Sequence, residues 1–436
     1  MSSSATVAFG GYARALREQR GLTLRRVCEL SANSALEIDK ATLSRLERGH
    51  QNPGLSTLIQ LSRIYDVPVE ALADRFELDS ELDRLGLVDT YGRSRSELAG
   101  LGRRALLQKN DKWSAYGWFR AALDRATLDE IDPRLADADE QKAVARLDLA
   151  TVARSLGKNR YALFEYREVE RSGRLPEAWH PVLLDRIANC HRCQRHFDVA
   201  ERYADRAVGE ALTLNDRRTL AHAYQSLAAI AMDQMAPEQA IEPLRRAFRA
   251  SRDADVGSCA GALAPNPGFE VDTLVQLADA YCDQGRYRRA ANVALAAKRL
   301  AIARVLPGAR AFSDLFLGSA EEAAGRHNRA LHLWRNVVLW ARIQNNHRLE
   351  FMAEFFIFRQ ATGRGQRGLA EASRRRLERL TPWVRSGLPQ VIEFREMCGG
   401  RIDSSVDPTN RCRTDRGKPA GRGRFVTAPG VESTTP

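Results

Sequence analysis

The sequence lacks the features that would let the chain cross a membrane or enter a secretory pathway. Its longest apolar stretches, such as FMAEFFIF at 351–358, are far shorter than the roughly 20 residues of a membrane-spanning helix. The N-terminal segment MSSSATVAFGGYARALREQ has no basic region followed by an apolar core, which is the pattern of a secretory signal. We therefore expect a cytoplasmic protein that makes no membrane contact.

Motifs for catalysis are missing as well. The chain contains no Walker loop, no HExxH, no GxSxG and no dinucleotide-binding glycine pattern after a strand. The histidines fall at ordinary helix-surface or turn positions. We therefore expect a protein that is not an enzyme and that needs no cofactor.

Cysteine is sparse, with seven residues scattered along the chain. An odd number without regular spacing fits reduced thiols better than a disulfide framework. Cys190 and Cys193 form a CxxC motif beside His191 and His196, which raises the question of a zinc site. A second ligand pair at zinc-finger spacing is missing and the segment has a helical pattern, so we expect no metal.

Strand signals are nearly absent between about residues 96 and 398, where Ala, Leu and Arg recur at helical spacing. Apolar residues make up 44% of the chain and charged residues 28%, as in an ordinary soluble protein. The net charge of +12 is spread along the whole length, so it is compatible with a polyanionic partner without locating one. The sequence predicts an all-α protein.

One stretch, KATLSRLERGHQN at 40–52, has residue types that packing alone does not explain. Asp39 is a suitable N-cap, Leu43 and Leu46 would face a core, and Gly49 would end the helix. The remaining side chains would face outward: Lys40, Ala41, Thr42, Ser44, Arg45 and Arg48. A short helix with a polar outer face is suited to the major groove of DNA, where arginine pairs with guanine. A solvated amphipathic helix is the simpler alternative.

The surrounding segment resembles the helix-turn-helix of the xenobiotic-response-element (XRE) family, to which the lambdoid phage repressors belong. The matching stretches are YARALREQRGLTLRRV at 12–27 and IDKATLSRLERGHQNPGLSTLIQLSRIYDVPVEAL at 38–72. This resemblance implies a five-helix, lambda-repressor-like domain that binds a double-stranded DNA operator, with Thr23 capping the second helix. It implies base contacts from Lys40, Ala41 and Arg45, with Ser44 on the same face, and phosphate contacts from Thr42, Arg48 and Asn52.

Two departures from the family pattern leave a second interpretation open. Leu24 stands where the family often has a glutamine that touches a phosphate, and the turn SANSALEI at 31–38 is longer than usual. A longer turn could change the tilt of the helix at Lys40. Together with Ala41, these features favour the alternative of a protein-interaction scaffold whose helix-turn-helix no longer reads DNA.

Six segments in the rest of the chain share one pattern of small residues around a turn. The clearest copy is LADAYCDQGRYRRA at 277–290, and the six turn positions are 157, 195, 235, 285, 325 and 365. Most neighbours lie about 40 residues apart, and the one longer spacing contains a Gly- and Pro-rich loop at 253–268. The pattern resembles tetratricopeptide repeats (TPR), which implies an α-solenoid of antiparallel helix pairs. A period near 40 implies helices longer than the standard ones.

A solenoid of this kind leaves a groove lined by the first helix of each pair. We define a groove set of polar and aromatic residues at these positions: Arg186, Asn189, Arg192, Tyr224, Gln225, Gln276, Asp279 and Asp283. Such side chains suit capture of a peptide or protein ligand, and regulators that this architecture resembles bind short peptides there. A plain solvated inner face is the alternative. Because two-fold operators are read by two-fold proteins, we also expect a homodimer.

These patterns predict five regions along the chain. They are a flexible N-terminus at 1–8, a DNA-binding domain at 9–78, a helical linker at 79–105, a repeat domain at 106–398 and a disordered tail at 399–436. The tail is predicted from its Gly, Pro, Thr and Arg content.

Overall fold

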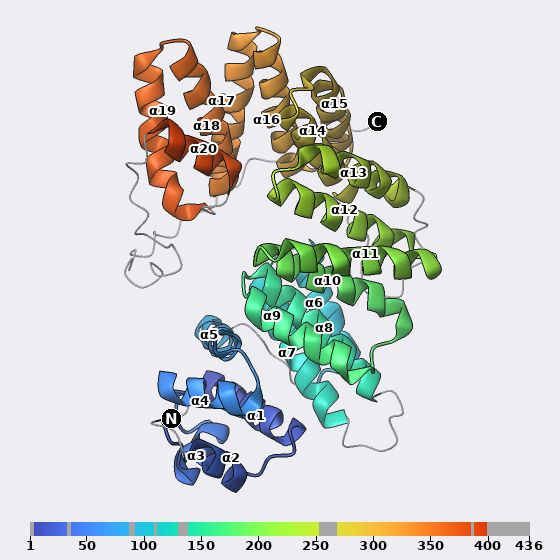
Figure 1. Ribbon diagram of the computed structural model, residues 1–436, viewed down its shortest axis with the longest axis vertical. Helices are drawn as coiled ribbons and strands as arrows, with labels where there is room; N and C mark the ends of the chain where they lie inside the picture. The colour runs from blue at the N-terminus through green and yellow to red at the C-terminus, as the bar shows by residue number, and fades with distance from the viewer. Residues whose placement is uncertain are drawn as a thin grey trace, which may run out of the picture. The chain divides into compact units, whose positions relative to one another are not determined.

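A computed structural model shows a helical protein (Figure 1) and describes residues 4–32, 36–86, 92–108, 111–129, 138–252, 268–384 and 388–398. Within these ranges the structure has twenty α-helices, two short 3-10 helices and no strand. The predicted all-α fold is therefore confirmed. None of the described helices is both long and apolar enough to span a membrane. The chain divides after Ala323 into two compact units, and each is described by itself.

The first unit begins with five helices, as predicted. They are α1 (Ser4–Gln19), α2 (Leu24–Ser31), α3 (Lys40–Glu47), α4 (Leu55–Tyr65) and α5 (Val69–Leu85). Their core contains Phe9, Leu16, Val27, Leu43 and Leu61, none of which is more than 1% exposed. The apolar residues of each helix recur at helical spacing, so burying them in one core holds the five helices together.

The first turn of α1 corrects one prediction. We expected a flexible segment at 1–8, but α1 begins at Ser4, and Ala5 and Thr6 are buried. The Thr6 hydroxyl donates a 2.9 Å hydrogen bond to Oδ1 of Asn52. Ser-rich composition suggested disorder, but these small residues allow helix α1 to lie close to the loop that follows α3. Residues 1–3 are outside the described ranges.

Two glycines allow α1 to approach the end of α3 closely. A Cβ at Gly10, in the middle of α1, would lie 2.4 Å from the carbonyl oxygen of Leu46. A Cβ at Gly49 would lie 2.5 Å from Cα of Val7, and Gly49 has a φ of +72°. Neither position can carry a larger side chain unless backbone atoms move.

Helix pairs follow this domain through the rest of the first unit. The first pair is α6 (Arg95–Gln108) and α7 (Lys112–Asp129). The later pairs are α8 (Ala138–Ser155) with α9 (Asn159–Ser172), α10 (His180–Cys193) with α11 (Phe197–Thr213), α12 (Arg217–Asp233) with α13 (Pro237–Arg252), and α14 (Phe269–Asp283) with α15 (Tyr287–Ala303). The 3-10 helix η1 (Glu177–Trp179) precedes α10, and α16 (Pro307–Ala323) ends the unit.

All six predicted turn positions have the left-handed backbone that a tight helix–helix turn requires. Gly157, Gly285, Gly325 and Gly365 have positive φ angles, and so do Arg195 and Met235, with φ of 63° and 61°. Most helices from α11 to α18 are 17 residues long and are joined by three-residue turns. This arrangement explains the period near 40.

The second unit contains α17 (His327–Ile343), α18 (His347–Gly363), α19 (Arg367–Leu380), the 3-10 helix η2 (Thr381–Trp383) and α20 (Pro389–Met397). Helix α18 is buried nearly all round and carries Phe351, Met352, Phe355, Phe356 and Phe358. Phe394 of α20 packs edge-on against Phe351 and Phe358. The final helix therefore covers apolar surface that α18 would otherwise expose.

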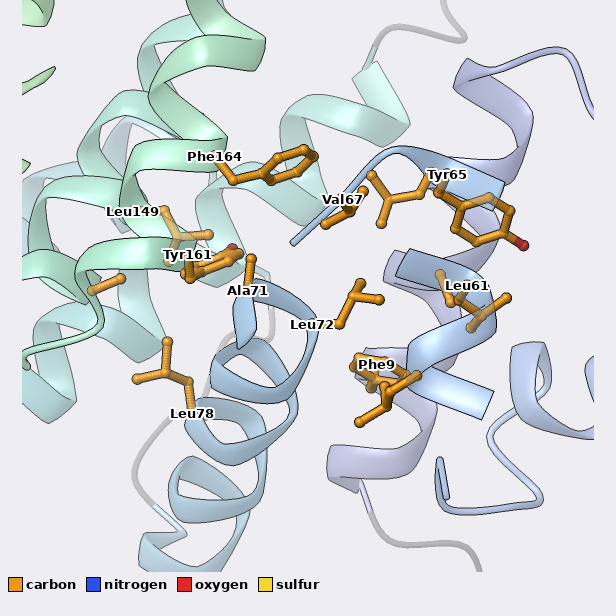
Figure 2. Close-up of a cluster of buried hydrophobic side chains, with 14 of the residues drawn as sticks. Phe9, Leu61, Tyr65, Val67, Ala71, Leu72, Leu78, Leu149, Tyr161 and Phe164 are labelled. Carbon is orange, nitrogen blue, oxygen red and sulfur yellow. The ribbon is translucent and has the colours of Figure 1, made fainter. Parts of the chain in front are cut away.

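The five-helix domain and the α8–α9 pair share one hydrophobic core. Figure 2 shows Phe9, Leu61 and Leu72 on one side, with Leu149, Tyr161 and Phe164 of the pair on the other. Ala71 and Leu78 of α5 lie between the two groups. The predicted domain boundaries remain predictions, but one continuous cluster of buried side chains extends across this junction.

We predict that Gly10→Ala destabilises the N-terminal domain by about 1 to 3 kcal/mol, because the new Cβ meets backbone that cannot move independently. Gly11→Ala is the matched control, since nothing lies within 4 Å of a Cβ there. This neighbour should be neutral or stabilising by up to about 1 kcal/mol through helix propensity. Urea unfolding followed by circular dichroism measures both. Equal stability of the two variants would contradict the close packing of α1 on α3.

Candidate nucleic-acid interface and predicted groove

Helix α3 begins and ends where its sequence predicts. Oδ1 of Asp39 accepts a 2.8 Å hydrogen bond from the Thr42 amide, and the Thr42 hydroxyl donates a 2.6 Å bond to Oδ2. These bonds lower the pKa of Asp39, so the cap is charged at neutral pH. At the other end, the amides of Gly49 and His50 bond back to the carbonyls of Leu46 and Arg45. Both ends of the helix are thus held by their own residues.

The outward face of α3 presents the residues that the sequence singled out. Lys40, Ala41, Arg45 and Arg48 are exposed, whereas Leu43 and Leu46 are at most 2% exposed. Thr42 and Ser44 are half-buried. The long cationic side chains therefore extend from a helix whose apolar side is fixed in the core.

Two of the predicted phosphate-contacting residues already have intramolecular partners. The Thr42 hydroxyl binds Asp39, and Nη2 of Arg45 lies 3.4 Å from it. Oδ1 of Asn52 accepts from Thr6, which leaves its amide N–H groups as the donors for a phosphate.

Thr23 caps α2 by accepting a 3.2 Å bond from the Arg26 amide. Leu24 is partly buried against the core.

A buried ion pair that sequence analysis missed holds the last turn of α3. Nε and Nη2 of Arg17 donate to the two oxygens of Glu47 at 2.7 and 2.9 Å, and Nη1 donates to the Leu22 carbonyl at 2.7 Å. The side chains of Arg17 and Glu47 are only 10% and 6% exposed. A bidentate pair of this kind fixes the orientation of α3 against α1. Thirty positions separate the partners, so no local pattern could have identified them.

Ser31 bonds the residues on either side of the long turn before α3. Its hydroxyl accepts a 3.0 Å bond from the Ile38 amide and donates a 2.9 Å bond to the Cys28 carbonyl. Ser31 is fully buried. Ser31 therefore links the end of α2 to Ile38, just before α3, and residues 33–35 lie outside the described ranges.

Comparison with known proteins agrees with this geometry. Residues 8–76 match the family model described as a helix-turn-helix domain. This segment is a helix-turn-helix domain. No curated protein sequence matches the chain.

Solved structures share the repeat fold. One is a signal transduction ATPase with numerous domains from Pyrococcus horikoshii, which has a tetratricopeptide repeat sensor; its TM-score is 0.51 at 13% identity. The match covers 85% of this chain but 53% of that protein, so the chain spans about half the length of this relative. The apo form of RapI has a TM-score of 0.50 at 11% identity, covering 71% of this chain and 82% of RapI. The repeats therefore form a TPR-like solenoid.

The helix-turn-helix domain is attached to the α8–α9 pair through a buried polar cluster centred on Arg75. This guanidinium donates to Asp79 and to the Tyr161 hydroxyl, both at 2.8 Å, and lies 4.8 Å above the ring centre of Tyr12. Nη1 of Arg120 donates to the other oxygen of Asp79 at 3.0 Å. Burial raises the pKa of Tyr161, so its hydroxyl keeps its proton.

A second polar group ties α1 to the same pair. The Tyr12 hydroxyl donates to Oε1 of Glu165 at 2.9 Å, and Nε of Arg146 lies 2.7 Å from Oε2. Nε2 of Gln19 donates to Glu168 at 2.8 Å. The partners lie about 150 positions apart in sequence. Together with the shared core, these bonds fix the direction of α3 relative to α8 and α9.

The eight residues of the groove set all lie on α10, α12 and α14, the first helices of successive pairs. Three of them form contacts between neighbouring helices. Nδ2 of Asn189 donates to Ser226 at 2.8 Å, Arg192 pairs with Asp233 at 2.5 Å, and Nε2 of Gln225 lies 3.5 Å from the Thr273 hydroxyl. Their use as ligand contacts remains a prediction.

The other members are placed differently. Arg186 is half-buried and pairs with Asp185 at 3.2 Å, while Arg246 lies over the ring of Tyr224. Gln276 and Asp279 are half-buried and Asp283 is exposed, at intervals of three to four residues along α14. Nearby Asp272 is on the same face, and surrounding protein atoms raise its pKa to about 6 although it is exposed to solvent. A solvent-exposed carboxylate that is surrounded by protein atoms is typical of a concave surface.

The CxxC segment does not assemble a metal site. Cys190 is buried, which raises its pKa to about 12, and His191 stacks on Tyr203 with its ring centre 5.8 Å away. Among the residues that the structure describes, no group of three or more His, Cys, Asp or Glu side chains could hold a metal ion.

We predict that Tyr161→Phe loosens the helix-turn-helix domain from the repeats. The change removes the acceptor for a buried donor of Arg75, which costs about 1 to 3 kcal/mol. Tyr166→Phe on the same helix is the control, because the Tyr166 hydroxyl bonds only Thr151 of the paired helix α8, at 3.1 Å. Hydrogen exchange should show faster exchange in α1 and α5 for the first variant alone. Equal exchange in both variants would contradict the coupling.

His222 should make stability depend on pH. Burial and the nearby Arg186 and Arg218 lower its pKa to about 4, so the folded chain keeps it neutral where the unfolded chain is protonated. Stability should therefore fall as pH drops from about 6.5 towards about 4, by up to about 2 kcal/mol between about pH 7.5 and about pH 5.

Urea unfolding at these two pH values tests this prediction. Between them, the His222→Gln variant should lose less free energy of unfolding than the wild type. His191, whose pKa is also lowered to about 4, should keep a similar contribution in the variant. An unchanged pH dependence in His222→Gln would show that His222 is solvated in the folded protein.

Proposed function

We propose that this protein is a transcriptional regulator that binds a DNA operator through α3. The observation that carries the proposal is the pairing of a rigidly capped helix with exposed Lys40 and Arg45 on its outer face. Arginine and lysine in the first turns of such a helix reach base edges in the major groove. The Arg17–Glu47 pair supports this role, because a base-reading helix must be held in one orientation.

We further propose that the TPR-like repeats form a homodimer and sense a peptide or protein ligand. Two-fold pairing would present two α3 helices to a two-fold operator, and one small domain makes too few contacts for tight binding. The polar side chains along α10, α12 and α14 support the sensing role. A monomer in sedimentation experiments with operator DNA would exclude the dimer.

An interaction scaffold with an inactive helix-turn-helix is the second candidate. Leu24 supports it, because its partly buried side chain cannot offer the phosphate contact that a glutamine would make. A gel shift with the DNA upstream of the chain's own gene separates the two functions, since only the regulator should bind a defined sequence.

We predict that Arg45→Ala abolishes sequence preference and leaves the fold intact. One bidentate contact to guanine is worth about 1 to 3 kcal/mol for each protomer, and Arg45 is exposed. Arg63→Ala is the control, because Arg63 is an exposed arginine of the same domain on α4 rather than α3. Competition gel shifts with specific and scrambled duplexes measure the preference. An Arg45→Ala protein that retained full preference would show that α3 does not read bases through this residue.

A further inference from the structure

The second unit carries an unusual concentration of arginine on two of its helices. Helices α17 and α19, with Arg326 and Arg364 that precede them, contain ten arginines, two glutamates and no lysine, a net charge of +8. In the first unit, by contrast, α11 has two arginines against four acidic residues. We define the arginine face as these ten side chains: Arg326, Arg329, Arg335, Arg342, Arg364, Arg367, Arg374, Arg375, Arg376 and Arg379.

Much of this charge is available to a partner. Arg335, Arg364, Arg367 and Arg379 are exposed, and within the described residues none of these four has an acidic partner. Arg374 and Arg375 share Glu371 at 3.1 and 3.0 Å. The face therefore keeps a large excess of positive charge after its internal ion pairs are formed.

A pocket of 260 Å³ joins α17 and α19 above α18. Its floor includes Glu354, which is fully buried and accepts bonds from Arg342 and Arg376, both at 3.0 Å, and from Ser373 at 3.1 Å. Arg342 also donates to Glu350 at 2.6 Å. The buried carboxylate thus holds guanidinium groups from α17 and α19 beside the pocket. Arg335 also lines this pocket and contributes a third guanidinium group.

From this arrangement we propose that the arginine face binds the phosphate backbone of double-stranded DNA, as a contact separate from α3. The proposal rests on the proposed DNA-binding function. Guanidinium groups form bidentate hydrogen bonds with phosphate oxygens and carry a permanent charge. Helix α17 is about 25 Å long, which matches several phosphates along a duplex that has one charge per roughly 1.7 Å.

Other occupants fit this face less well. A second copy of the chain would place the same patch against itself in a two-fold interface, and like charges would repel. An acidic protein would need an apolar centre in addition to charge, and the exposed apolar residues of α17 are Leu339 and Ile343 alone. DNA held by α3 is tethered to the same chain, so a weak phosphate contact gains from a high effective concentration.

The test is the salt dependence of binding to a duplex of about 40 base pairs without an operator, using the full-length protein between roughly 50 and 300 mM salt. In Arg335→Glu with Arg379→Glu, the slope of log K against log salt should be less steep by about 2, because two phosphate contacts are lost. Affinity at low salt should fall at least about tenfold. Arg202→Glu with Arg206→Glu on α11 is the matched control, and its slope should stay close to that of the wild type.

One further variant and two further measurements separate the explanations. Arg335→Lys with Arg379→Lys keeps the charge and should keep the slope, while circular dichroism must show that every variant is folded. A wild type without any operator preference would refute the proposed function and leave the slope comparison on the operator-free duplex intact. An unchanged slope in the glutamate pair, or equal losses in the α11 control, would overturn the proposal. If the glutamate pair lost binding to poly-glutamate while its DNA binding stayed intact, the face would be assigned to an acidic protein instead.

Discussion

The orientation of helix α3 depends on one buried cation, Arg75. Removing a guanidinium from water is costly unless its donors are satisfied, and here the acceptors come from α5 and α9 together. The cluster is complete only when the helix-turn-helix domain is docked on the α8–α9 pair. Docking is therefore coupled to the shared core around Phe9 and Tyr161, and partial separation would leave one donor of Arg75 without its acceptor on α9.

This constraint limits how a ligand could act on DNA binding. A ligand shifts an equilibrium only through different affinities for two states. Because α3 is fixed to α8 and α9, the two states must differ further along the solenoid or, in the proposed dimer, between protomers, rather than at the junction. Changes in the packing of successive helix pairs would then move the whole reading domain as one body.

Local signals in the sequence were sufficient for the ends of α3 and for the repeat. Asp39 and Thr23 cap helices through their own side chains, and the six positions predicted as turns have the positive φ of a tight turn. The Arg17–Glu47 and Tyr12–Glu165 contacts could not be predicted, because they join residues 30 and 153 positions apart. The first turn of α1 was missed for the same reason: its helix depends on packing against α3, whereas its composition suggests disorder.

The predicted groove shows how inter-helix contacts and ligand sensing could compete. Asn189 and Arg192 of α10 bond Ser226 and Asp233 of α12, so these side chains set the spacing of two neighbouring helices. A ligand that recruited either residue would have to break its bond to α12 and so would favour a different spacing of α10 and α12. The polar residues on α10 are therefore suited to transmit ligand binding to α12.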